Sequence, residues 1–363
     1  TSWAKLFPAK PADWWRRNRE GRKTPLYRFN NDMVFVDGRL LKAVGWEGEI
    51  DANSFAIDYE AGHVYLGINP AAHGKEVIGT TLEHVTISFC SRVGGYFRGD
   101  RMVFRHCRVS DTSTEGIFIL SSSDVLLEKN IFARNNVEEI TGYYPAAVKI
   151  FNQCHRVTCR DNPVIDQPLS NGIWYDVGNV DGVFVNNWIE GAIDGFFFEI
   201  SKGAICAGNV FVNCDKGIRI LNASGVQVYQ NTFVNTVASF ERTERSAVGD
   251  HFGWHPRTGP DVDQRDGHAF VGNLLVADES SHKPLLRFEQ PAALNARLTR
   301  PQVARLDANV YVRRGDTAGR PLIAWSPIPG NPGRVEFTSL DELRRLESGF
   351  EGSGRLALKD MPV

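Results

Sequence analysis

The strongest constraint on the fold is a repeat of about 22 residues in which two landmarks recur together. One landmark is a small residue that opens an apolar run, at Gly116, Ala147, Gly172, Gly195 and Gly217. The other is an asparagine that opens a shorter run, at Asn130, Asn162, Asn187, Asn209 and Asn231. The small residues follow one another at steps of 31, 25, 23 and 22, and the asparagines at steps of 32, 25, 22 and 22. Because the two landmarks lengthen and shorten their steps together, they mark a true internal repeat.

A repeat of this length, with about three short β-rich runs and no helical spacing of apolar residues, predicts a β-solenoid. Each coil cannot bury its own apolar face, whereas stacked coils share one continuous core. Asparagines at one phase are then expected to stack as a ladder of side-chain amides in a turn. A β-propeller blade needs about twice this repeat length, and the leucine-rich consensus is absent. We therefore expect an all-β fold, a single-stranded right-handed parallel β-helix.

Three regions are expected along the chain. Residues 1–80 form an N-terminal arm and a β-rich module, because MVFVDGRLL and SFAIDYEAGHVYLGI alternate apolar and polar residues around turn signals. Residues 81–277 form the rungs of the β-helix, interrupted by a long polar loop at 238–268. Residues 278–363 form the last rungs and a capping tail, with a short helical pattern over 339–348. A solenoid needs such a cap over its open end.

Composition excludes several classes of function. The 41 Lys and Arg nearly balance the 43 Asp and Glu, so no whole-protein field favours nucleic acid. No run approaches the ~18 apolar residues that span a membrane. The six cysteines lack a CxxC pattern and a zinc-finger histidine spacing, so we expect buried thiols and no metal or cofactor. Disulfides within Cys154–Cys159 or Cys206–Cys214 are the alternative.

Two adjacent rungs carry near-copies of one phrase, GIWYD and GFFFE, each with a carboxylate four residues after its glycine. These carboxylates, Asp176 and Glu199, are 23 residues apart, one local repeat. Side chains alternate across a strand, so with Ile173 and Tyr175 inward, Trp174 and Asp176 point outward. Parallel strands lie about 4.8 Å apart, which predicts carboxyl groups roughly 5–6 Å apart.

That separation is typical of retaining glycosidases, whose carboxyl groups lie about 5–5.5 Å apart, rather than of inverting ones at ~6.5–9.5 Å. Mutual repulsion and apolar neighbours are expected to raise the pKa of one carboxyl, so that one acts as nucleophile and the other as acid/base. The ordinary interpretation is that Asp and Glu are common on outward faces and pair there with a cation.

Residues around the pair supply further candidates. Trp174 and Phe197 make the outward face unusually aromatic, which predicts that it is covered or binds a ligand. Lys149 and Asn152, one rung earlier, could contact sugar hydroxyls, although Lys149 could instead only pair with Asp176.

Two longer turns also carry candidates. Glu139, a reserve acid/base, and Tyr144 lie in the long turn of the 31-residue rung. Trp254 and His255, in the long loop, could form a sugar platform and a hydroxyl contact; a tryptophan that only packs the loop is the alternative.

The GIWYD rung, followed 23 residues later by the glutamate of FFFEIS, resembles the β-helix glycoside hydrolases of family 120, which include β-xylosidases. The resemblance implies a retaining mechanism with Asp176 as nucleophile and Glu199 as acid/base. Other segments, MVFVDGRLLKAV and SLDELRRLESGFEGSG, are similar to secreted bacterial β-helix proteins, which implies a secreted or periplasmic location. Such proteins usually have rungs and a cap ahead of VFVDG, so a longer chain or a partner chain in an oligomer is expected to complete that end.

The expected partner is an oligosaccharide or polysaccharide, with no nucleic acid and no membrane. Two other functions remain open. A polysaccharide lyase acting on a uronic-acid glycan would use Lys149 as base, often with a calcium cluster of carboxylates. A non-catalytic carbohydrate-binding β-helix would use the aromatic outward face alone.

Overall fold

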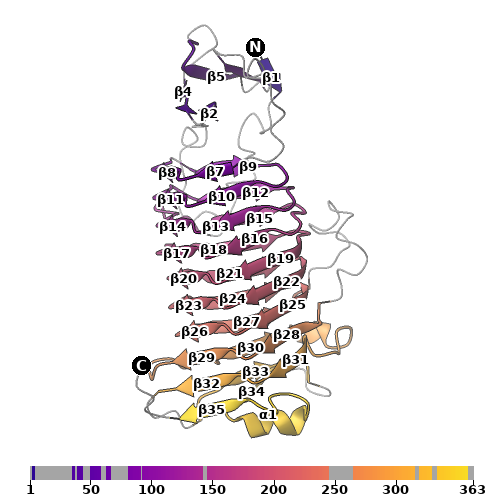
Figure 1. The fold of residues 1–363 in the computed structure, drawn as a ribbon. Helices are drawn as coiled ribbons and strands as arrows, with labels where there is room; N and C mark the ends of the chain where they lie inside the picture. The colour runs from indigo at the N-terminus through magenta and orange to yellow at the C-terminus, as the bar shows by residue number, and fades with distance from the viewer. Residues whose placement is uncertain are drawn as a thin grey trace.

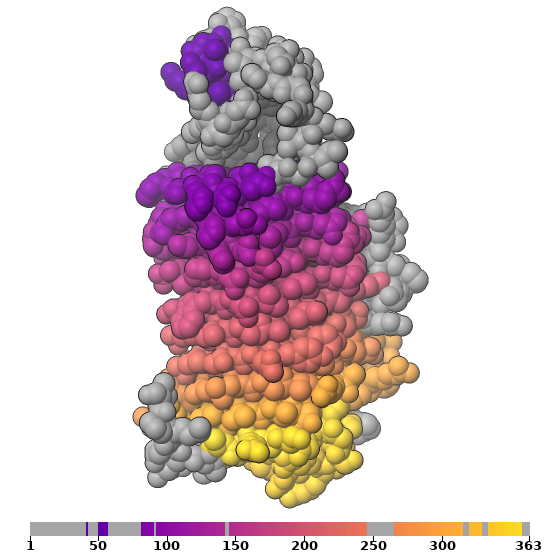
Figure 2. Space-filling view, in the orientation of Figure 1, coloured from indigo at the N-terminus to yellow at the C-terminus, as the bar shows by residue number. Residues whose placement is uncertain are grey.

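A computed structural model describes residues 2–4, 35–36, 39–43, 50–58, 63–66, 81–90, 92–141, 145–244, 265–314, 319–328 and 333–358. In this part of the chain, coils of short strands stack along one long axis (Figures 1 and 2). The chain passes once per coil through each of three long sheets, named here by their first strands as the β7, β8 and β9 sheets.

The β7 sheet contains, in spatial order, β7 (Thr81–Glu83), β10 (Val103–Arg105), β13 (Leu126–Glu128), β16 (Thr158–Arg160), β19 (Val180–Val185), β22 (Lys202–Ala207), β25 (Ser224–Tyr229), β28 (His268–Val271) and β31 (Val303–Asp307). The β8 sheet contains β8 (Thr86–Ser88), β11 (Arg108–Ser110), β14 (Ile131–Ala133), β17 (Pro163–Ile165), β20 (Trp188–Glu190), β23 (Val210–Val212), β26 (Thr232–Val234), β29 (Leu274–Ala277), β32 (Val310–Arg313) and β35 (Arg355–Leu358). The β9 sheet contains β9 (Gly95–Phe97), β12 (Ile117–Leu120), β15 (Ala146–Phe151), β18 (Asn171–Asp176), β21 (Asp194–Glu199), β24 (Lys216–Leu221), β27 (Val237–Glu241), β30 (Leu286–Glu289), β33 (Ile323–Trp325) and β34 (Val335–Phe337).

Within these sheets each strand pairs in parallel with the strand one coil away, apart from the antiparallel pair β33–β34. The predicted right-handed parallel β-helix is therefore confirmed. The small-residue landmark has a steric cause: a Cβ at Gly172 would lie 2.4 Å from the carbonyl oxygen of Gly195, and one at Gly195 would lie 2.6 Å from that of Gly217.

The core lies inside the coils, where inward side chains of successive rungs stack. Phe184, Phe211, Phe233 and Phe270 form one column, with ring centroids 6.3, 5.1 and 5.9 Å apart from one member to the next. Repeating the same ring at the same phase lets each coil bury its apolar face against its neighbours.

The predicted asparagine ladder is present. Each Oδ1 atom accepts hydrogen bonds from the backbone N–H and the side-chain amide of the asparagine one rung earlier, at 2.8–3.1 Å. The ladder runs through Asn130, Asn162, Asn187, Asn209, Asn231, Asn273 and Asn309. It ends at Glu351, whose carboxylate accepts from the Asn309 amide at 2.7 Å.

A short helix, α1 (Leu340–Leu346), lies at the yellow, C-terminal end of the stack (Figure 1). Ser339 caps it through a reciprocal capping box with Glu342, and Leu343 is fully buried. A 3-10 turn, η8 (Ala292–Leu294), lies between β30 and β31.

Short strands are also described in the N-terminal region. β2 (Phe35–Val36) and β3 (Arg39–Leu40) form an antiparallel hairpin. A four-stranded sheet has the order β1 (Ser2–Ala4), β6 (His63–Leu66), β5 (Ser54–Asp58) and β4 (Lys42–Ala43).

One predicted boundary is wrong. The loop expected over 238–268 begins later, because β27 extends to Glu241 and pairs in parallel with β24. Ala238 and Phe240 point into the core, while Ser239 and Glu241 lie on the other face. The polar residues on that face made the sequence of this strand resemble a loop. All six cysteines are free thiols, as expected, and all but Cys90 are buried.

Candidate functional site

The two candidate carboxylates occupy the same position on neighbouring strands. β18 and β21 are paired in parallel with Ile173 opposite Phe196 and Asp176 opposite Glu199. Their backbones are therefore one strand spacing apart, about 4.8 Å. This register is the one that the 23-residue spacing predicted.

The side chains alternate across these strands as expected. Ile173, Tyr175, Phe196 and Phe198 belong to the interior core. Trp174 and Phe197 lie on the opposite face, where they form a separate small cluster with Ala146 and Leu221. Their rings stack at a centroid distance of 4.7 Å and an interplanar angle of 18°.

This outward face is not open to solvent. Trp174, Asp176, Phe197 and Glu199 retain only 5, 7, 4 and 5% of their accessible surface. Carboxyl groups are rarely this buried unless they are paired or functional. The burial agrees with the prediction that an aromatic outward face is covered or binds a ligand.

Lys149, on β15, links the carboxylate to the aromatic pair. Its ammonium lies 3.0 Å from Oδ2 of Asp176 and 3.5 Å from the centroid of the Trp174 ring. It thus makes both an ion pair and a cation–π contact within a buried cluster. This is the pairing that the second interpretation of Lys149 expected.

Arg219, on β24, lies on the other side of the aromatic pair, 4.9 Å from the centroid of the Phe197 ring. Its guanidinium also pairs with Asp194 at 3.3 Å and with Glu241 at 3.0 Å. Burial lowers the pKa of Arg219, but the surrounding carboxylates of Asp194, Glu241 and Glu199 outweigh burial and raise it. The stacked Trp174–Phe197 pair therefore has a cation on each side, Lys149 beside Trp174 and Arg219 beside Phe197.

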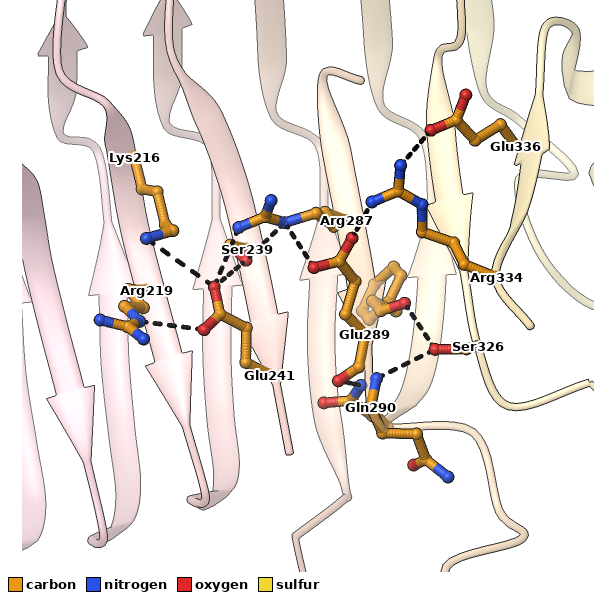
Figure 3. Close-up of polar contacts among 12 residues, drawn as sticks. Lys216, Arg219, Ser239, Glu241, Arg287, Glu289, Gln290, Ser326, Arg334 and Glu336 are labelled. Carbon is orange, nitrogen blue, oxygen red and sulfur yellow. Dashed lines mark hydrogen bonds and ion pairs between the residues drawn. The ribbon is translucent and has the colours of Figure 1, made fainter. Parts of the chain in front are cut away.

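Further along the same face, the carboxylates are saturated by cations (Figure 3). Glu241 accepts from Arg219, Arg287 and Ser239 at 3.0, 3.0 and 2.7 Å, and Lys216 lies 3.9 Å away. Glu289, one rung on, contacts Arg287 and Arg334. These two belong to the column of Asp176 and Glu199, yet their contacts mark them as structural ion pairs.

The other predicted residues fall in three places. Asn152 lies in the turn after β15, where its backbone N–H donates to the carbonyl of Asp176 at 3.3 Å. Glu139 is exposed in a turn, and its backbone N–H donates to the carbonyl of Asn136 at 2.9 Å. Tyr144, Trp254 and His255 lie outside the described residues.

Two buried carboxyl groups on this sheet were not predicted, Glu115 and Asp194. Both directly precede the glycine of an apolar run, a signal that the sequence did contain. Glu115 is fully buried beside β12 and accepts from the Thr114 hydroxyl. Burial raises the pKa of Glu115, while the nearby positive charges of Arg92 and Lys149 oppose that rise. Asp194 pairs with Lys216 and Arg219, both at 3.3 Å.

Within the described ranges, no three or more His, Cys, Asp or Glu side chains converge closely enough to hold a metal ion. A helix long and apolar enough to cross a membrane is also not found among the residues that the structure describes.

The three parallel sheets and the shared inner core define the class of protein, a right-handed parallel β-helix. The sequence agrees, because residues 67–233 match the family model described as a right handed beta helix region. Comparisons with curated proteins and with solved structures find no match. The fold occurs in carbohydrate-active enzymes and in non-enzymatic proteins, so the fold alone does not define the function.

Proposed function

We propose that this protein is a carbohydrate-active enzyme, a retaining glycoside hydrolase that uses Asp176 as nucleophile and Glu199 as general acid/base. One observation carries the proposal: the two carboxylates are in register on adjacent strands and buried beside a stacked aromatic pair. A spacing of one strand, about 4.8 Å, suits direct attack on the sugar, because an inverting enzyme leaves room for water between its carboxyl groups.

In the first step, a carboxylate oxygen of Asp176 would attack the anomeric carbon as the bond to the leaving oxygen breaks. Glu199 would give its proton to that oxygen, releasing the leaving group as an alcohol. Water would then attack the anomeric carbon, transferring its proton to Glu199 and freeing Asp176.

The neighbouring side chains have supporting roles in this mechanism. Trp174 and Phe197, stacked on each other between Lys149 and Arg219, pack beside the two carboxylates and keep their surroundings apolar. Lys149 holds Oδ2 of Asp176 and so fixes the direction of its other oxygen, a positioning role. The resemblance to β-xylosidases makes a β-xyloside the first substrate to test. We also propose that the protein degrades polysaccharides and that it is secreted or periplasmic.

A non-catalytic carbohydrate-binding β-helix is the second candidate, since the Lys149–Asp176 ion pair would also suit a carboxylate with a purely structural role. The lyase alternative has weaker support. Its base would have to be a deprotonated lysine, whereas Lys149 faces the carboxylate of Asp176.

A mechanism-based label tests the proposal. A 2-deoxy-2-fluoro-β-xyloside with a dinitrophenyl leaving group should trap a glycosyl-enzyme, and mass spectrometry of peptides should place the label on Asp176. Fragmentation of the peptide that carries Asp176 separates it from Glu190, an outward carboxylate on β20 that serves as the unlabelled control. A label on another residue would contradict the assignment of Asp176 as nucleophile.

A further inference from the structure

A polar hollow lies beside the carboxylate pair, on the turn that leads from the β9 sheet to the β7 sheet. Its volume is about 390 Å³, within the roughly 300–1,000 Å³ of small-molecule sites. Three successive rungs line it, with Arg98 and Asp100 from the first, Ser121 and Ser123 from the second, and Asn152, Gln153 and His155 from the third.

The stacking of the rungs holds the backbone of the lining residues in place. Ser123 pairs with His155 in a parallel bridge, and the backbone N–H of Ser123 donates to Oδ1 of Asp100 at 2.8 Å. Phe151 is the strand partner of Asp176, so on the next rung Val177 and Gly178 are equivalent to Asn152 and Gln153, and Val180 is bridged to His155. The polar lining thus ends where the apolar valines begin.

Five of the seven lining side chains are available to a ligand in the described part of the chain. In the described part of the chain, the side chains of Arg98, Asn152 and His155 hydrogen-bond to no protein group, nor do those of Ser121 and Gln153. Charged residues of nearby turns are instead paired with each other, as Arg156 is with Asp124 at 2.7 Å.

The chemistry of this lining favours a neutral sugar. Hydroxyl and amide side chains both donate and accept hydrogen bonds, as sugar hydroxyls do. Asp100 is a carboxylate and would repel an acidic ligand, while Arg98 adds donors for ring or hydroxyl oxygens. The hollow also adjoins the carboxylate pair, because Phe151, directly before Asn152, is the strand partner of Asp176.

We propose that the hollow is a subsite for the sugar units that neighbour the unit held at Asp176 and Glu199, and that the substrate is therefore a neutral oligosaccharide. This inference rests on the proposed function. It predicts that affinity increases with chain length, because only longer glycans reach from the carboxylates into the hollow.

Calorimetry with neutral disaccharides and tetrasaccharides (xylose, glucose, mannose and arabinose series) tests this, in an Asp176→Asn background that prevents turnover. A tetrasaccharide should bind at least tenfold more tightly than its disaccharide. The combined Arg98→Ala and His155→Ala substitution should abolish that gain, and neither residue has the left-handed backbone that makes alanine costly at Asn152 and Gln153. The combined Arg305→Ala and His282→Ala substitution removes an exposed arginine and an exposed histidine that lie outside the hollow and have no left-handed backbone, so it is the matched control and should keep the gain. If the double variant unfolds at lower temperature than the control, Arg98→Gln with His155→Gln replaces it.

A tetrasaccharide gain that survives loss of Arg98 and His155 overturns the subsite, as does binding of galacturonate oligomers alone. Absence of any saccharide binding also overturns it, and the hydrolase proposal then stands if the parent still cleaves aryl xyloside. Binding that depends on the hollow in a parent that hydrolyses nothing supports the subsite and refutes the hydrolase.

Discussion

At the residue scale, the ion pair of Lys149 and Asp176 dominates the electrostatics of the site. Both side chains are nearly buried, at 6 and 10% exposure, and lie 3.0 Å apart. Removing one partner of a buried pair leaves an uncompensated charge, which costs about 3–5 kcal/mol. The pair therefore links the stability of these rungs to the geometry of the proposed nucleophile.

We predict that Lys149→Met lowers the free energy of unfolding by about 3–5 kcal/mol, because it strands the Asp176 carboxylate. In an Asp176→Asn background the same substitution should cost much less. Urea unfolding of the four proteins of this double-mutant cycle measures the difference. Equal costs in both backgrounds would show that the two side chains are not coupled.

Sequence alone could predict which residues share this face but not how they are covered. The 23-residue step between Asp176 and Glu199 equals one rung, so their register followed from the repeat. Their burial depends on what packs over the face, which no periodicity encodes. For the same reason Glu115 was missed, since its position before Gly116 says nothing about solvent access.

At the scale of the elements, the asparagine ladder ties successive rungs together. Asn209 accepts from the backbone and amide of Asn187 at 2.8 and 3.0 Å, and its own amide donates to the carbonyl of Phe184 at 2.9 Å. The position of the ladder could be predicted from the sequence because asparagine recurs at the same place in each repeat. Strand β27 could not be predicted, since the polar Ser239 and Glu241 alternate with the buried Ala238 and Phe240 and make the segment resemble a loop.

We predict that Asn209→Ala destabilises the protein by at least about 3 kcal/mol, because several buried groups lose their partners at about 1–3 kcal/mol each. Asn213→Gly, an exposed asparagine one turn later with a left-handed backbone that glycine tolerates, is the control and should cost little. Chemical denaturation checks both. A cost for Asn209→Ala no greater than that of the control would refute a structural role for the ladder.

The end of the ladder predicts a pH dependence. Burial raises the pKa of Glu351, although hydrogen bonds from Tyr311 and Asn309 oppose the rise. A carboxyl group whose pKa is higher in the folded state than in the unfolded state, where it is about 4.3, favours folding while it is protonated. That contribution to stability is complete below about pH 4.3 and is lost as the pH rises through the folded-state pKa. Glu351→Gln cannot ionise, so its stability relative to the parent should increase from about pH 4.3 upward. Urea unfolding between pH 4 and 8 measures this; a constant difference would contradict it.

At the scale of the whole molecule, each coil contacts only its neighbours, so stability is transmitted along the stack. The last rungs depend on α1, which buries Leu343 against the core. Loss of this cap should therefore loosen the C-terminal coils more than the coils around β18 and β21.

We predict that Leu343→Ala costs about 2–5 kcal/mol of local stability, as buried leucine truncations do. Hydrogen exchange should accelerate most in β32, β33 and β35 and least in β18 and β21. Leu346→Ala, on the same helix but 38% exposed, is the matched control. Uniform acceleration along the whole stack would show that the coils unfold as one cooperative unit.

The central claim is that Asp176 and Glu199 hydrolyse a glycoside with retention, and one kinetic comparison tests it most directly. Aryl β-xyloside hydrolysis should be lost in Asp176→Ala and in Glu199→Ala but kept in Glu289→Gln, which alters a structural carboxylate of the same column. Azide should restore turnover to the acid/base variant Glu199→Ala and yield a β-xylosyl azide, because the covalent intermediate formed on Asp176 persists there. Full activity in both alanine variants, with no azide product, would contradict the account.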